Sequence, residues 1–174
     1  YSVTITPTAD GTVTVDLAAA TAQDAAGNDN TVATQFSIET DGTAPSVALS
    51  TSSADPVSGA FTLDVVFSES VTGFTIGDLT VGNGTASAFA GSGDTYSATI
   101  TPAADGAVTV DVAADAAQDS AGNGNTVATQ FSITSDGTGP SVVLSTTATD
   151  PIGFGFTLDI VFSESVTGLT AGDL

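Results

Sequence analysis

The side chains of this 174-residue sequence that could do chemistry are carboxylates and hydroxyls. The sequence has 17 Asp, 3 Glu and no Lys, Arg, His or Cys, which gives a formal charge of −20. Most general bases, nucleophiles and Schiff-base formers are His, Cys or Lys. A hydrolase that uses a pair of carboxylates stays conceivable, but the composition favours a protein that is not an enzyme.

The uniform negative charge also restricts partners and points to cations. Nucleic acids are bound through Lys and Arg, and an anionic membrane surface would repel this chain, so we expect neither nucleic acid nor membrane insertion. Self-repulsion opposes compact folding, and bound cations would relieve it. Asp is a short oxygen ligand suited to Ca²⁺, which takes about six to eight oxygens, although Asp is also an ordinary turn residue.

The chain has an internal repeat of 95 residues. Residues 1–79 align without a gap on residues 96–174, with 57 identities in 79 pairs. We therefore expect the C-terminal half of one repeat at 1–40, a complete repeat at 41–135 and the N-terminal half of the next at 136–174. Since half repeats expose sheet edges, we expect the chain to be part of a longer array. The alternative is that the halves complete each other between molecules by strand donation.

The complete repeat reads as a series of short strands. Hydrophobic residues make up 41% of the chain and the mean hydropathy is +0.31, which argues against disorder. Clusters of Gly, Asn, Asp, Ser and Pro separate the expected strands. These strands are Ser46–Ser50, Phe61–Ser68, Phe74–Val81, Thr85–Ala90, Thr95–Thr101, Ala107–Ala113 and Thr126–Ile133. The pattern predicts an all-β fold, a seven-stranded immunoglobulin-like sandwich repeated in tandem.

Alternation within the strands predicts the core. Apolar residues occupy every second position of Phe61–Ser68 and Ala107–Ala113, which is typical of a half-buried strand. In Thr126–Ile133 the same rule places Val127 on the inner side. We also expect Tyr96 and all nine Phe residues to lie in the core.

Several sequence blocks resemble a known family. They are FSE-x-V-TGF from Phe67, TPAADG from Thr101, D-x-AGN-x-N from Asp119 and the linker D-x-T-x-P at Asp41 and Asp136. With them the whole repeat resembles the bacterial Ig-like repeats of giant surface adhesins and biofilm-associated proteins. The resemblance implies a secreted, stalk-like array that spaces a binding tip from a cell, often with Ca²⁺ between its domains.

The acidic loops are expected to meet where repeats join. Because successive strands reverse direction, the linker, the loop after the second strand and the loop before the last strand share one pole of the sandwich. We predict a junction Ca²⁺ site there, faced by an acidic loop of the preceding repeat. The predicted ligands of this junction and the next are Asp41, Glu69, Asp119, Asn123 and Asp10, and then Asp136, Glu164 and Asp105. The alternative is a tight turn, in which Asp119 binds backbone amides and Asn123 is left-handed.

These expectations lead to one function and two alternatives. The first is a structural extender of a secreted cell-surface adhesin or extracellular filament, stiffened by Ca²⁺ at the repeat junctions, with neighbouring repeats as its main partners. The alternatives are a self-assembling sheath or surface layer, and a repeat that itself binds a glycan or a partner protein.

Overall fold

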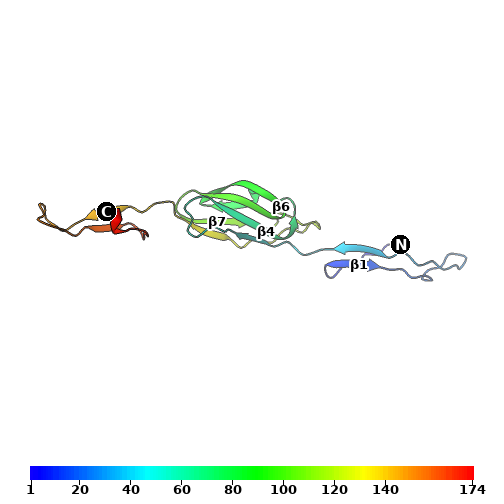
Figure 1. Cartoon of the computed structure of the whole chain (residues 1–174). Helices are drawn as coiled ribbons and strands as arrows, with labels where there is room; N and C mark the ends of the chain where they lie inside the picture. The colour runs from blue at the N-terminus through cyan, green and yellow to red at the C-terminus, as the bar shows by residue number, and fades with distance from the viewer.

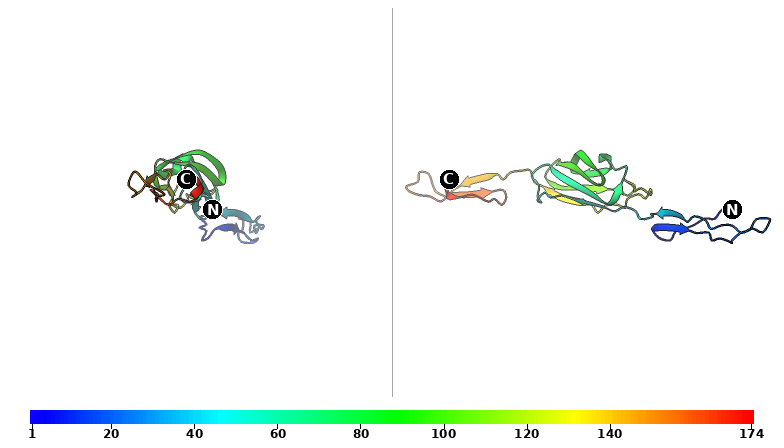
Figure 2. Two further views of the ribbon diagram at one scale, coloured as in Figure 1. Left: turned by 60° about the vertical axis from the view of Figure 1, so that its left-hand side comes forward. Right: turned by 45° about the vertical axis from the view of Figure 1, so that its right-hand side comes forward.

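The computed structural model describes residues 1–174 as three segments placed end to end (Figures 1 and 2). The central segment is a two-sheet sandwich. The first segment is a hairpin of β1 (Gly11–Val15) and β2 (Phe36–Thr40). The last contains β9 (Val142–Ser145), β10 (Asp159–Phe162) and a short 3₁₀ turn, η2 (Ala171–Asp173). The molecule is therefore elongated, with its two ends far apart.

The first sheet of the sandwich has the strand order β3-β4-β6, all antiparallel. Its strands are β3 (Val47–Ser50), β4 (Phe61–Val71) and β6 (Gly84–Pro102). In β4 every second residue from Phe61 to Phe67 is at most 4% exposed. The predicted inner face of this strand is confirmed, because side chains alternate between the two faces of a sheet.

Strand β6 folds back on itself. A straight strand of its 19 residues would span about 60 Å, yet Gly84 lies against the carbonyl of Thr101, and the Ser87 hydroxyl donates to the Thr99 carbonyl at 3.5 Å. Gly91 and Gly93 both have positive φ, +120° and +70°, and this freedom of glycine allows the reversal. The two strands predicted at residues 85–90 and 95–101 therefore both lie within β6.

The second sheet has the order β5-β7-β8, again antiparallel. Its strands are β5 (Leu79–Gly82), β7 (Gly106–Val112) and β8 (Phe131–Ser135). After β3 the chain crosses to this sheet, where Val57 forms a parallel bridge with Ser135. The two sheets and their antiparallel connections agree with the predicted all-β, immunoglobulin-like sandwich.

The hydrophobic core lies wholly inside the central segment. All 17 of its buried residues fall between Val57 and Ile133. The aromatic rings of Phe67, Phe74 and Tyr96 contact one another edge to face, with centroids 5.1–6.0 Å apart, an arrangement that aromatic pairs favour. Residues 41–135 thus have a complete core of their own.

The last predicted strand, Thr126–Ile133, is wrong in its first half. Strand β8 begins only at Phe131, and Val127 is 69% exposed while Ala128 is buried. The backbone N–H of Thr126 donates to the Pro45 carbonyl at 2.8 Å, and that of Ala128 donates to the Val112 carbonyl at 3.0 Å. The segment before β8 is therefore held by the linker, and its alternation is out of step with that of β8.

The strand predicted at Phe74–Val81 is also shorter than expected. Residues Ile76–Asp78 form the 3₁₀ turn η1, and β5 begins at Leu79. The carboxylate of Asp78 accepts the backbone N–H and the hydroxyl of Thr75, at 2.8 and 2.9 Å. This is the carboxylate half of a capping box, which starts a helical turn rather than a strand.

The two terminal segments leave apolar side chains exposed. Phe36 is 56%, Phe154 95% and Phe156 52% exposed, so the prediction that all nine Phe lie in the core is wrong for these three. Each terminal segment has a single two-stranded sheet with no second sheet opposite it. The helical elements are two three-residue turns, and neither has the length or apolarity needed to cross a membrane.

Candidate metal site at the repeat junction

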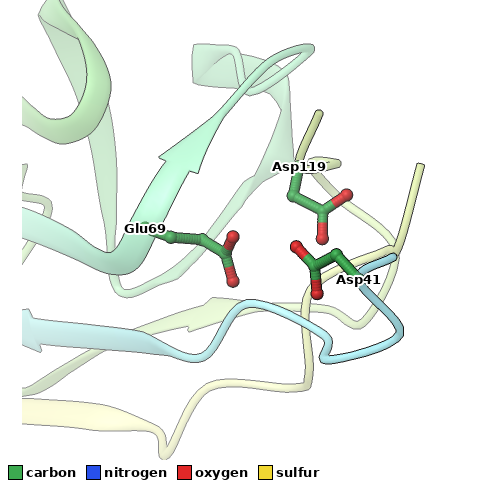
Figure 3. A group of neighbouring side chains, drawn as sticks. All are labelled: Asp41, Glu69 and Asp119. Atoms are coloured by element: carbon green, nitrogen blue, oxygen red, sulfur yellow. The ribbon is translucent and has the colours of Figure 1, made fainter. Parts of the chain in front are cut away.

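Three carboxylates from different parts of the fold converge at the pole where the central repeat meets the first segment (Figure 3). Asp41 belongs to the linker before β3, Glu69 lies near the end of β4, and Asp119 lies in the loop between β7 and β8. One oxygen of each lies within 4.8 Å of the others. Asp41 is exposed, Glu69 is half-buried and Asp119 is buried. The structure therefore brings three of the predicted ligands together.

A tight turn orients Asp119. Its Oδ1 accepts the backbone N–H groups of Ala121 and Asn123, at 2.8 and 2.9 Å, which confirms the predicted bonding to backbone amides. The prediction that Asn123 is left-handed is wrong, since Gly122 takes the positive φ, +91°. Glycine has no Cβ and adopts this conformation without a steric penalty.

Asn123 joins this turn to the linker. Its Nδ2 donates to Asp119 Oδ2 at 2.8 Å and to the Asp41 carbonyl at 3.1 Å. In this geometry the amide nitrogen of Asn123 points toward the carboxylates. It fixes the turn that contains Asp119 against the linker that contains Asp41. A role for Asn123 as a ligand through its oxygen stays a prediction.

The carboxylates influence each other's protonation. Burial, and then the negative charges of Asp41, Asp119 and Asp10, raise the pKa of Glu69 above its ordinary value of 4.5. Burial also acts to raise the pKa of Asp119, but hydrogen bonds from Asn123 and from the turn amides outweigh it and hold that pKa below its usual range. Asp119 is thus a stable anion beside a carboxyl group whose charged form is disfavoured.

This donor set fits Ca²⁺. Two oxygens bound to one Ca²⁺ ion, each at about 2.3–2.6 Å, lie at most about 5 Å apart, and the three carboxylates meet that limit. Asp41, Glu69 and Asp119 would hold the ion, and water would complete its oxygen shell. A cation there would offset the repulsion that raises the pKa of Glu69.

Asp10 lies beside this group without joining it. Its carboxylate accepts the backbone N–H of Gly42 at 2.7 Å and the hydroxyl of Thr43. It contributes to the raised pKa of Glu69, so its charge reaches the cluster. Its predicted role as a ligand stays a prediction, while the structure shows it bound to the linker.

The second junction repeats part of this arrangement. Asp105 accepts the backbone N–H of Gly137 at 2.6 Å and the hydroxyl of Thr138. Asp136 directly precedes these residues, and Glu164 is exposed just after β10. The position equivalent to Asp119 would follow residue 174, so the three-carboxylate group occurs once in this structure.

Asn125, the last residue of the D-x-AGN-x-N block, has a role that the sequence did not predict. Asn125 is 1% exposed. Its Oδ1 accepts the backbone N–H of Ala117 at 2.7 Å, and its Nδ2 donates to the carbonyls of Ala113 and Thr126, at 2.9 and 2.8 Å. It therefore fixes the loop that carries Asp119. Asn30, the equivalent residue of the preceding repeat, makes the same three bonds. Recurrence alone could not have revealed the role, because 57 of the 79 aligned pairs are identical.

Fold and site together define an immunoglobulin-like domain with an acidic pole. Comparison with family profiles gives the same class: the profile described as bacterial Ig-like domain matches residues 41–135. The chain belongs to this family, whose members are non-catalytic domains. The comparisons with curated proteins and with solved structures found no match.

Proposed function

We propose that this chain is an extender in a bacterial surface adhesin or extracellular filament. The observation that carries the proposal is the end-to-end placement of its three segments (Figure 1). The linkers at Asp41 and Asp136 leave the sandwich at opposite poles, so each added repeat lengthens the molecule. In a linear array of self-contained sandwiches joined in this way, each repeat contacts only its neighbours, and the array holds its two ends apart.

Ca²⁺ stiffens the junctions in this proposal. A cation bound by Asp41 would tie the linker to Glu69 and Asp119 of the repeat that follows. The negative charges of Asp41, Asp119 and Asp10 around Glu69, and the charge of −20 on the chain, both favour cation binding at this point.

We infer an extracellular setting for the array. Bacterial Ig-like domains are often extracellular, and extracellular modules bind Ca²⁺ with Kd values of about 10⁻⁴–10⁻³ M. The partners in this setting are the neighbouring repeats of the same chain.

The test uses a polypeptide of three joined copies of residues 41–135. Each copy has a complete core, so it should fold independently. We expect the polypeptide to have a higher Tm in millimolar Ca²⁺ than in EDTA. We also expect small-angle scattering to show fewer bent conformations in Ca²⁺, with maximum dimensions close to that of the fully extended molecule. If neither quantity differs between Ca²⁺ and EDTA, junction stiffening by Ca²⁺ is wrong.

A matched pair of variants on β4 locates the site. Glu69→Gln removes one charge at the pole, and the Glu69 carboxylate takes part in no hydrogen bond that the change would break. Asp64→Asn removes one charge from the same strand, away from the cluster. By calorimetry, Glu69→Gln should weaken Ca²⁺ binding at least tenfold and Asp64→Asn should leave it unchanged. Equal affinities in the two variants would contradict the proposed ligands.

A further inference from the structure

The linker between two repeats is bound from both sides. On the side of the preceding repeat, Asp10 accepts the N–H of Gly42 at 2.7 Å and the hydroxyl of Thr43. On the side of the following repeat, Asn123 donates to the Asp41 carbonyl at 3.1 Å. The Pro45 carbonyl accepts a further backbone bond from that repeat at 2.8 Å. Most of the short linker therefore has a fixed partner, with no cation involved.

The carboxylate of Asp10 continues the β1–β2 ladder beyond its end. The last pair of that ladder is Gly11 with Thr40. Past this pair the backbone of the linker has no strand opposite it, and the two oxygens of Asp10 take the place of the missing strand. Because one oxygen holds a backbone N–H and the other a side-chain hydroxyl, the linker is restrained at two points on consecutive residues.

The same contact recurs 95 residues later. Asp105 binds the N–H of Gly137 at 2.6 Å and the hydroxyl of Thr138, just past the pair Gly106 with Ser135. In both copies the hydroxyl bond and then the backbone bond lower the pKa of the Asp, so the carboxylate is ionised near neutral pH.

We propose that Asp10 and Asp105 are carboxylate clamps that set the direction in which the linker leaves each repeat, independently of any cation. A clamp holds Gly42 and Thr43, which directly follow Asp41, and it thereby also positions Asp41 toward Glu69 and Asp119. The clamp itself does not depend on the proposed extender function. Only its importance does, because a fixed linker direction is useful in an extended array of repeats.

The test measures junction order directly in three joined copies of residues 41–135, where Asp105 of one copy faces Gly42 and Thr43 of the next. The chain has no cysteine, so single cysteines introduced at the exposed Thr62 of two neighbouring copies can carry spin labels. Electron–electron double resonance in EDTA then gives the width of the distance distribution across the junction.

Asp105→Asn and Thr43→Val should each broaden that distribution at least twofold in EDTA. Thr43→Ser retains the hydroxyl and should keep the distribution narrow, as should Asp64→Asn, which removes one charge elsewhere. An unchanged Tm in Thr43→Val would show that the repeats themselves are intact. A distribution as narrow as that of the parent in both Asp105→Asn and Thr43→Val would overturn the clamp.

The outcomes separate the clamp from the Ca²⁺ site. Broadening in Asp105→Asn, in a protein whose parent does not respond to Ca²⁺, supports the clamp and rejects Ca²⁺ stiffening. A response to Ca²⁺ in the parent, together with no broadening in either clamp variant, rejects the clamp and retains the cation site.

Discussion

Replacing Asn125 with alanine should destabilise the repeat strongly, although the residue belongs to a surface loop. The side chain is buried and makes three hydrogen bonds to backbone groups: it accepts from Ala117 and donates to Ala113 and Thr126. Alanine would remove all three and leave a backbone N–H and two carbonyls short of partners. Ala117 is buried, so its unpaired N–H would retain its full desolvation penalty, whereas Ala113 and Thr126 are exposed residues.

The expected loss is at least about 3 kcal/mol, because each of the three hydrogen bonds contributes about 1 kcal/mol and the unpaired N–H adds to the loss. In a domain of this size about 3 kcal/mol corresponds to a fall in Tm of about 12–24 °C. Asn125→Asp should be at least as harmful. Its second oxygen would face the carbonyls of Ala113 and Thr126, where the amide now donates.

The assay is urea unfolding of residues 41–135 in EDTA, with Val127→Ala as the control. Val127 is two residues away and 69% exposed, so its truncation should change the free energy of unfolding by less than about 0.5 kcal/mol. If Asn125→Asp instead stabilised the repeat, and more so with Ca²⁺, Asn125 would be a cation ligand and the structural role argued above would be refuted. A loss below about 1 kcal/mol in Asn125→Ala would refute it as well.

Three further predictions concern the core and pH. Leu63→Ala should lower the free energy of unfolding by about 3–4 kcal/mol in urea titrations, since Leu63 is fully buried; a loss under about 1 kcal/mol would contradict the core assignment. Tyr96→Phe should cost about 1 kcal/mol, because the buried hydroxyl donates to the Val71 carbonyl at 3.3 Å; no loss would mean that this bond adds nothing. In EDTA, Tm should rise as pH falls from 7 toward 4.5, because the raised pKa of Glu69 favours its protonated form in the folded state. Tm should fall again below 3.8, where the lowered pKa of Asp119 makes its protonation unfavourable to the fold; a Tm that only declines with acid would contradict the raised pKa.

Strand alternation could be predicted where a segment forms backbone hydrogen bonds only with neighbouring strands of its own sheet. The inner positions of Phe61–Phe67 and of β7 are buried as the period of two requires. The prediction failed at Val127 because the backbone there bonds to Pro45 of the linker. A local pattern contains no information about a partner about 80 residues away.

The site could be predicted to the level of its loops. Reversing strands sends the linker and the loops after β4 and β7 to one pole, which is why Asp41, Glu69 and Asp119 meet. Side-chain roles within those loops depend on hydrogen bonds that spacing does not reveal. Asn125 is buried and structural, and Asn123 donates its amide nitrogen to Asp119 and to the linker.

Stability and shape should be separable properties of this protein. The core lies wholly within residues 41–135, so changes there alter the free energy of unfolding without changing the direction of the next repeat. The linker buries Pro45, while Asp41, Gly42 and Thr43 are exposed. Asp10, Asn123 and the group around Glu69 act on this exposed part. A change at Asp10 should loosen the array while each sandwich unfolds as before, whereas Glu69 and Asp119 also belong to the sandwich and affect its stability. An extender needs both properties, because a stable repeat at a loose junction would not hold a distant end in place.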